Sequence, residues 1–483
     1  MLNEFFNFNS KNTNLKTEFI AGLTTFLAMS YILGVNPTML SEGGMPATSI
    51  FFSTALASGI ACIIMGLVSK YPVGLAPGMG MNALFTYTII LTMGNSWQAA
   101  LAAVFISSVI FLLITVSGLR EAILNAIPND LRLAIGAGIG FFLAFIGLSG
   151  AGIIVSDPST VVGLGSLTSA PALLALLGIL ITLMLFIKKV PAAVFSGLII
   201  TAIIGLIFTT LGFGAGEMTM PSVPTQIISF NFDTTVFFGF ASGFGEIFSN
   251  IPNLIMILFS LLFFTFFDTT GTLISLANQS GFVDENGDIE RIDKAFIGDA
   301  LGGVVGAVLG TSTLTAYVES ATGIGLGGRT GLTAIFTGIF FLISVIFAPA
   351  VLSLFTSSVT AAALVIVGIL MIVPLKDIEW DSMVVVSSTF ITIIMMILTY
   401  SITLGIAFGF VTYAIASIAD GKAKELNWLV WILVIIFIIY LFIGHWFQYP
   451  LFFLFLNLLS NFYLNYTQPY LLLSLMYDYK YNH

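Results

Sequence analysis

Two interrupted apolar stretches decide the fold: Pro72-Val-Gly-Leu-Ala-Pro-Gly-Met-Gly-Met-Asn-Ala83 and Gly310-Thr-Ser-Thr-Leu-Thr-Ala-Tyr-Val-Glu-Ser-Ala-Thr-Gly-Ile-Gly325. Each is apolar enough to enter a membrane, but glycine and proline interrupt it before a full-length helix can form. Irregular backbone is tolerated at membrane depth only where protein or a water-filled cavity covers it. Because the two stretches stand at matching places in the two halves of the chain, they indicate an internal repeat whose halves meet near the middle of the bilayer.

The composition is that of an integral membrane protein. Hydrophobic residues make up 58% of the chain and charged residues 8%, whereas soluble domains carry about 25% charge. The long apolar runs lack the two-residue alternation of a membrane barrel, so the spanning segments are predicted to be helices. The single cysteine, Cys62, excludes an internal disulfide, and no Cys/His cluster has metal-ligand spacing. We therefore predict an all-α polytopic membrane protein with no metal site and no cofactor.

The basic residues predict the topology. The chain has 14 of them, at Lys11, Lys16, Lys70, Arg120, Arg132, Lys188, Lys189, Arg291, Lys294, Arg329, Lys376, Lys422, Lys424 and Lys480. Seven apolar intervals separate these clusters, each long enough for a helical hairpin, although 295–328 needs short or broken segments. If every cluster is cytoplasmic, as the positive-inside rule favours, the chain crosses fourteen times with its N-terminus inside.

Each half of this topology has seven crossings. The predicted spans are 17–37, 47–69, 79–93, 98–118, 131–150, 171–187, 191–212, 254–280, 295–310, 315–326, 331–353, 359–373, 383–399 and 401–419. Since seven is odd, the two halves would be inverted relative to each other. The loops 38–46, 151–170 and 213–253 contain no Lys or Arg, which fits an extracytoplasmic position.

Two carboxylates lie inside these spans. Asp268 follows an uncharged run and precedes the polar run Thr269-Thr-Gly-Thr272, and Glu319 lies among small polar residues. A charge at bilayer depth costs on the order of 3 kcal/mol or more, so it usually faces a cavity, a partner or a substrate. We interpret both as functional, with Thr272 on the same polar face. The structural alternatives are a helix-end carboxylate for Asp268 and an interhelical hydrogen bond for Glu319.

Two further polar residues have competing interpretations. Asn82 stands in the first interrupted stretch, where its amide, both donor and acceptor, suits a planar polar ligand but could equally cap the short helix. Asp299 lies five residues beyond Lys294, so we expect a structural ion pair there, near the cytoplasmic face.

At these motifs the chain resembles the nucleobase–cation symporters, within the nucleobase–ascorbate transporter superfamily, and specifically the AzgA-like hypoxanthine/guanine/adenine permeases. The resemblance covers about residues 15–425. Its blocks are Thr17-Glu-Phe-Ile-Ala-Gly-Leu-Thr-Thr-Phe26, Tyr31-Ile-Leu33, Val35-Asn-Pro37, Ala76-Pro-Gly-Met-Gly-Met-Asn-Ala83, Phe267-Asp-Thr-Thr-Gly-Thr-Leu273, Gly310-Thr-Ser-Thr313, Tyr317-Val-Glu-Ser320 and Gly327-Gly-Arg-Thr-Gly331.

The resemblance implies fourteen transmembrane segments in seven-plus-seven inverted repeats, with a short strand and a short helix in each of spans three and ten. It divides the chain into a cytoplasmic N-terminus (1–16), a core domain (17–118 and 254–353), a gate domain (131–212 and 359–419), an extracytoplasmic loop (213–253) and a hydrophobic C-terminal tail (420–483). The two domains are expected to move in an elevator-like cycle. Residues 426–443 are expected to form a peripheral or re-entrant helix, and the tail is atypical after residue 444.

The resemblance also implies a function: import of purine nucleobases by proton symport across the plasma membrane, by a homodimer. Asp268 and Glu319 would bind the base, Asn82 would line the site, and Tyr317 and the Val318 backbone would flank it. Either Asp268 or Glu319 could load and release the coupled proton. Our hypothesis gives Asp268 the proton-sensitive role and Glu319 the purine-reading role. Beyond the purine and the lipid bilayer no partner is implied, and no nucleic acid.

Other function classes fit the residues less well. An anion transporter of the sulfate or bicarbonate type would favour a positive pocket, whereas both buried charges here are acidic. The lone acidic sites argue against the charged ring of an ion channel. An enzyme lacks support because the only histidines, His445 and His483, stand in the tail and form no catalytic set. The sequence does not rank hypoxanthine, guanine and adenine.

Overall fold

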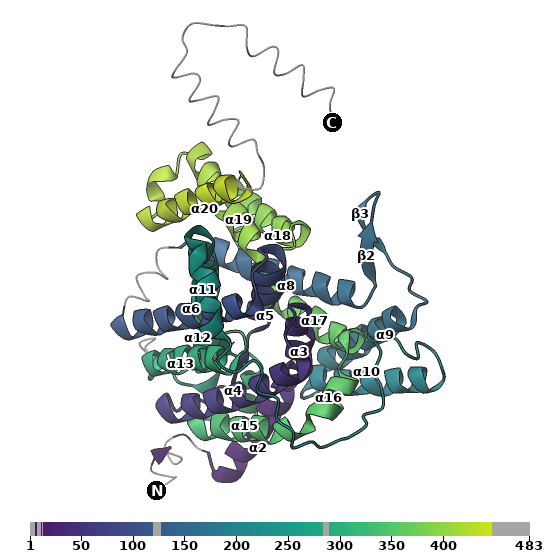
Figure 1. The fold of residues 1–483 in the computed structure, drawn as a ribbon. Helices are drawn as coiled ribbons and strands as arrows, with labels where there is room; N and C mark the ends of the chain where they lie inside the picture. Colours follow the sequence, from purple (N-terminus) through teal and green to yellow (C-terminus); the bar gives the residue numbers. More distant parts are fainter. Residues whose placement is uncertain (1–4, 7–10, 12, 119–126, 284–288, 447–483) are drawn as a thin grey trace, which may run out of the picture.

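The computed structural model describes residues 5–6, 11, 13–118, 127–283 and 289–446. The molecule is helical, with few and short strands (Figure 1). The predictions for the first residues of the N-terminus and for the tail beyond residue 446 lie outside the described residues.

Ten helices in the described part of the chain are long and apolar enough to cross a membrane. They are α2–α3 (Leu15–Met29 and Ile32–Glu42), α4 (Ala47–Val68), α6 (Trp97–Ser117), α8 (Asn129–Gly150), α9 (Ala170–Ile187), α10 (Ala193–Thr210), α12 (Ile251–Ser280), α15 (Gly331–Ser344, continued by the 3-10 turn η2, Val345–Phe347, and α16, Ala348–Leu354), α17 (Ser357–Ile372, continued by η3, Val373–Asp377) and α19 (Ile402–Ala419). The prediction of a polytopic helical membrane protein is confirmed.

The remaining four predicted spans are shorter, broken or more polar. They correspond to α5 with the π-helix η1 (Met79–Ala83 and Leu84–Thr92), α13 (Ile292–Leu309), strand β4 with α14 (Leu314–Ala316 and Ser320–Gly325), and α18 (Met383–Leu398). Each of the fourteen predicted spans therefore has a helical counterpart in the described chain.

The two interrupted stretches each contain a short strand, as the resemblance implied, and the two strands pair with each other. Strand β1 (Leu75–Pro77) runs antiparallel to β4, with Leu75 opposite Ala316 and Pro77 opposite Leu314. Each strand then leads into a short helix, α5 or α14. Lipid offers no hydrogen bonds to an extended backbone, so each strand forms its backbone hydrogen bonds with the strand of the other half. The two halves are therefore joined at their interrupted stretches.

Helix contacts come in matched pairs, as an inverted repeat requires. The packing of α4 on α15 corresponds to that of α13 on α6, and the packing of α9 on α17 corresponds to that of α18 on α8. The equivalent helices α8 and α17 pack on each other, with Gly140 and Gly368 face to face: a Cβ on Gly368 would lie 2.5 Å from the Gly140 carbonyl oxygen. The division of these helices into core and gate domains remains a prediction.

Two regions that the sequence predicts only as loops contain regular structure. Residues 151–170 hold a β-hairpin, β2 (Ile154–Asp157) with β3 (Val161–Leu164), which projects from the helical body (Figure 1). Within 213–253 lies helix α11 (Phe240–Ser249), which packs on α6 through Phe105 and Phe240, stacked at 4.4 Å. The absence of basic residues did not predict either element. The distribution of Lys and Arg indicates on which side of the membrane a loop lies, but not its secondary structure.

At the C-terminal end, the short turn η4 (Ala423–Glu425) leads to α20 (Trp428–Trp446), which packs on α19 and α12. Its Phe437 ring lies 5.0 Å from Phe259 and 5.4 Å from Phe410. A helix in this segment agrees with the expectation for 426–443.

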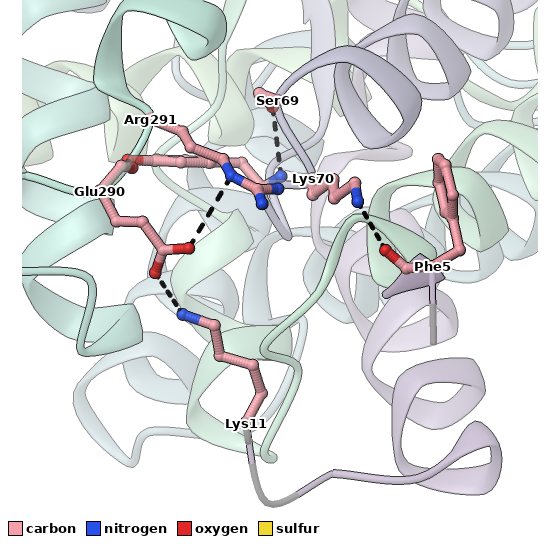
Figure 2. A network of polar contacts seen from close by, with 7 residues as sticks. Phe5, Lys11, Ser69, Lys70, Glu290 and Arg291 are labelled. Atoms are coloured by element: carbon pink, nitrogen blue, oxygen red, sulfur yellow. Dashed lines mark hydrogen bonds and ion pairs between the residues drawn. The ribbon is translucent and has the colours of Figure 1, made fainter. Parts of the chain in front are cut away.

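Basic residues from three separate clusters meet at one end of the molecule (Figure 2). Lys11 pairs with Glu290 at 2.5 Å, Arg291 lies 3.8 Å from the same carboxylate, and Lys70 donates to the Phe5 carbonyl at 2.6 Å. The N-terminal segment therefore packs against the loops that follow α4 and precede α13, which brings together basic residues that the topology assigns to one side.

Candidate functional site

Asp268 lies in the middle of α12, which is 30 residues long. Its carboxyl interacts with the Thr315 hydroxyl of β4, and its side chain is only partly buried. Thr272 lies one helical turn further along the same helix and is also partly buried. Asp268 thus points toward strand β4.

Glu319 occupies the position before α14 begins, three residues after the end of strand β4. The backbone enters this turn from a strand whose residues are all buried, while the Glu319 side chain stays partly accessible. A carboxylate at this position also complements the positive end of the short helix.

Two tyrosines hold the surroundings of Glu319 in place. The Tyr31 hydroxyl donates to Glu319 Oε1 at 2.7 Å, and the Tyr317 hydroxyl donates to the Pro77 carbonyl at 2.6 Å. The two rings lie 6.3 Å apart, and both side chains are almost fully buried. Because Tyr31 comes from the α2–α3 break and Pro77 from β1, both interrupted stretches and the first span contribute to one centre.

The centre is acidic. Asp268, Tyr317 and Glu319 lie close enough to one another to interact electrostatically. Within the described residues, neither Asp268 nor Glu319 forms an ion pair with Lys, Arg or His. An uncompensated carboxylate pair at membrane depth is suited to a ligand that donates hydrogen bonds, or to a proton, and unsuited to an anion.

Asn82 lies in α5, on the other interrupted stretch, and is fully buried. Its carbonyl oxygen accepts a hydrogen bond from the Ser312 hydroxyl, while its amide nitrogen has no partner among the described residues. No hydrogen bond in the described chain joins Asn82 to Asp268 or Glu319. An unpartnered buried N–H is costly, so this amide is a candidate donor to a ligand.

Val318 differs from its neighbours, since its side chain is 46% exposed. The prediction for Val318 concerned its backbone. The Val318 carbonyl accepts a hydrogen bond from the Ala321 N–H at 3.0 Å, where α14 begins.

The structure brings Tyr317, Glu319 and Asp268 together and places Thr272 on the same helix as Asp268. Asn82 lies apart from these residues in α5, after strand β1, where it is bonded to Ser312.

Sequence reasoning missed the role of Asp299. We expected an ion pair near the cytoplasmic face, but the side chain is 1% exposed and accepts hydrogen bonds from the Ala316 N–H at 2.9 Å and the Thr269 hydroxyl at 2.8 Å. It therefore links β4 to α12 beside Asp268. A carboxylate within a glycine-rich apolar run was the signal that could have identified it.

A second fully buried carboxylate, Glu18 of α2, also escaped the sequence interpretation. It is fully buried and accepts hydrogen bonds from the backbone N–H groups of Arg329 and Thr333, at 3.0 and 3.1 Å. These are N–H groups at the start of α15, which lack partners inside their own helix. Glu18 is a structural cap that ties span one to the connection between α14 and α15.

Comparison with known proteins assigns the family. The model of the family described as "Permease family" matches residues 16–410. The chain belongs to this permease family. It is 45% identical over 450 residues to the guanine/hypoxanthine permease PbuG of Bacillus subtilis, covering 90% of this chain and 98% of the relative. It is 36% identical over 439 residues to the adenine permease AdeP of Escherichia coli, covering 91% and 95%.

Solved structures support the fold. The transmembrane domain of the cyanobacterial bicarbonate transporter BicA superposes with a TM-score of 0.60 at 15% identity, covering 81% of this chain and 97% of that domain. SLC26A9 also gives a TM-score of 0.60, at 11% identity, over 87% of this chain and 68% of that chain. The predicted fold class and the family resemblance are confirmed, and the family consists of transporters and not of enzymes.

Proposed function

We propose that this protein imports purine nucleobases, namely hypoxanthine and guanine, with adenine as a further substrate, by proton symport. The names of its relatives support the substrate class. The observation that carries the proposal is the centre itself: a carboxylate held by a tyrosine at 2.7 Å, a second carboxylate close to it, and no basic partner for either among the described residues.

The chemistry of the base fits this centre. Hypoxanthine and guanine present ring N–H groups beside a carbonyl in one plane. An ionised Glu319 would accept an N–H in a charge-assisted hydrogen bond, roughly twice as strong as a neutral one. The unpartnered amide of Asn82 would donate to an acceptor on the base. Tyr317 and Val318 border the turn from which Glu319 extends, so the base would lie against the start of α14.

Asp268 takes the proton-sensitive role in this proposal. It lies on a continuous helix and interacts with Thr315, so its charge can change without the loss of a structural ion pair. A neutral Asp268 on the loaded protein would lower the cost of moving an acidic centre across the membrane. The core domain would carry the site past the gate domain in an elevator-like movement, within a homodimer in the plasma membrane.

The orientation follows from the basic residues that meet in Figure 2. Their clustering at one end supports a cytoplasmic N-terminus by the positive-inside rule. An anion transporter is the alternative that the fold neighbours bring forward, but a centre with two carboxylates and no described cationic partner would repel such a substrate.

Uptake of labelled hypoxanthine into cells that lack their own purine permeases tests the proposal. Unlabelled purines should compete, uracil and bicarbonate should not, and a protonophore should abolish accumulation. Asp268→Asn should remove the response to a pH gradient, whereas Glu319→Gln should weaken purine competition. Competition by bicarbonate, or accumulation that persists with the protonophore, would contradict the substrate or the coupling, respectively.

A further inference from the structure

Tyr31 lies where the first span bends. Helix α2 ends at Met29 and α3 begins at Ile32, and the turn of Ser30 and Tyr31 joins them. The Ser30 hydroxyl donates to the Leu27 carbonyl at 2.9 Å, so it satisfies a local backbone group at the bend. The Tyr31 side chain, 1% exposed, is free to extend from this bend into the protein.

The Tyr31 hydroxyl makes polar contacts with Glu319 and with the Tyr317 hydroxyl. Tyr31 donates to Glu319 Oε1 at 2.7 Å across 288 positions of sequence. Within the described part of the chain it is the only side chain that donates a hydrogen bond to the Glu319 carboxylate. The other oxygen, Oε2, therefore has no side-chain donor from the described protein, and the Glu319 side chain is partly accessible.

The ring of Tyr31 is itself held in place. It packs near Tyr317, whose hydroxyl is bonded to the Pro77 carbonyl of β1. The turn that bears Glu319 is fixed at its start by the backbone hydrogen bond from Tyr317 to the Gly74 carbonyl, at 3.0 Å. Donor and acceptor are thus both anchored to the same strand pair, which limits how far the carboxylate can rotate.

We propose that Tyr31 is a positioning and specificity-determining residue: its hydroxyl occupies one oxygen of Glu319, so that a single oxygen, in a fixed orientation, meets the substrate. This rests on the proposed function of Glu319 as the group that reads a purine N–H. When one oxygen of the Glu319 carboxylate already accepts from Tyr31, only the other oxygen is available to accept from a ring N–H of the ligand. The ligand then has no second, equivalent acceptor on Glu319. Tyr31 therefore makes Glu319 sensitive to whether the ligand carries that N–H.

Tyr31→Phe removes the hydroxyl and keeps the ring. The affinity for hypoxanthine, measured as an inhibition constant, should fall on the order of tenfold, because the Glu319 carboxylate is no longer held in one orientation before the ligand binds. The maximal uptake rate should change by less than about twofold. The decisive readout is discrimination: the ratio of the inhibition constants of singly N-methylated hypoxanthines to that of hypoxanthine should fall toward one, because the freed oxygen can accept from the ring N–H that these ligands retain.

Tyr71→Phe is the matched control. Tyr71 is equally buried, and its hydroxyl donates to the Glu290 carbonyl, an acceptor outside the candidate site, at 2.5 Å. This variant should keep the parent's discrimination. If Tyr31→Phe does not accumulate as folded protein, Tyr31→Met removes the same donor with a more adaptable side chain.

A double variant provides an independent check. If Tyr31 acts through Glu319, adding Tyr31→Phe to Glu319→Gln should cause no further loss of affinity. Unchanged discrimination in folded Tyr31→Phe, or losses that add in the double variant, would overturn the proposal. A parent protein that transports no purine would instead refute the proposed function, so the two failures are distinguishable.

Discussion

Asp299 of α13 accepts a hydrogen bond from the backbone N–H of Ala316, at 2.9 Å, and this contact fixes strand β4 beside the helix that carries Asp268. The other oxygen of the same carboxylate accepts from the Thr269 hydroxyl at 2.8 Å. The Asp299 carboxylate thus binds both Thr269, which is next to Asp268, and Ala316, which is next to Tyr317. The placement of the two predicted site carboxylates therefore depends in part on Asp299, which is itself buried.

Replacement of Asp299 should therefore affect both stability and transport. Asp299→Ala leaves the Ala316 N–H and the Thr269 hydroxyl without this acceptor, at a cost of about 2–3 kcal/mol. We expect a lower apparent melting temperature of the purified protein and a large loss of hypoxanthine uptake. Asp299→Asn keeps an acceptor for one donor and should retain more of both. Equal stability of parent and Asp299→Ala would show that the contact is unimportant.

The glycines between α4 and α15 allow close approach of the two helices. A Cβ on Gly66 would clash with the Gly331 carbonyl oxygen, and a Cβ on Gly338 would lie 2.5 Å from the Gly59 carbonyl oxygen. Backbone cannot move aside as a side chain can, so Gly66→Val should destabilise the fold by about 1–3 kcal/mol or more. Gly136→Ala is the control, because a Cβ there meets nothing within 4 Å. The measurement is the thermal unfolding temperature of each purified variant in detergent. Equal unfolding temperatures for Gly66→Val and Gly136→Ala would argue against this packing.

Asp233 connects the long segment 213–253 to the start of α4. Its carboxylate accepts from the Thr48 hydroxyl at 2.7 Å and the Thr235 hydroxyl at 2.6 Å. Partial burial raises the pKa of Asp233, but the hydrogen bonds from Thr235 and Thr48 outweigh it and hold the pKa below its ordinary value. A lowered folded-state pKa means that the stabilisation is present above the unfolded-state pKa and is lost as the pH falls through the folded-state value.

Thermal stability as a function of pH tests this connection. The parent should lose the contribution of Asp233 only at acidic pH, and Asp233→Asn should lose part of it at neutral pH, on the order of 1 kcal/mol. Asp157→Asn is the matched control, since Asp157 accepts only from Ser159 and Thr160 within its own hairpin. A pH profile of Asp233→Asn that coincides with the parent's would rule out a stabilising role.

The single cysteine makes the topology testable. Cys62 is fully buried, so the parent should react little with a membrane-impermeant thiol reagent. Ser166 and Lys424 are both exposed and lie on opposite sides in the predicted topology. In intact cells, Ser166→Cys should be labelled and Lys424→Cys should be labelled only after permeabilisation. The reverse pattern would place the N-terminus outside.

Much of the fold could be predicted from the sequence because hydrophobic length and basic residues report directly on the bilayer. Both interrupted stretches contained strands, since glycine and proline exclude a continuous helix there. Helix α11 and the β2–β3 hairpin were missed because they lie outside the spans, where hydrophobic length carries no information.

The site was predictable only in part. Asp268 and Glu319 were visible as charges within apolar runs. The roles of Tyr31 and Asp299 were not predictable, because they depend on contacts with residues that are remote in sequence. For Asn82 the sequence identified the residue but not its partner. Only the structure shows the hydrogen bond between Asn82 and Ser312.

Direct binding of labelled hypoxanthine to the purified protein tests the central claim, that Glu319 and Asp268 form a purine site. The parent should bind saturably, with competition from guanine and none from uracil, sulfate or bicarbonate. Glu319→Gln should lower the affinity by more than about tenfold, because a neutral amide replaces a charged acceptor. Folded Glu319→Gln that binds hypoxanthine as tightly as the parent would contradict the account.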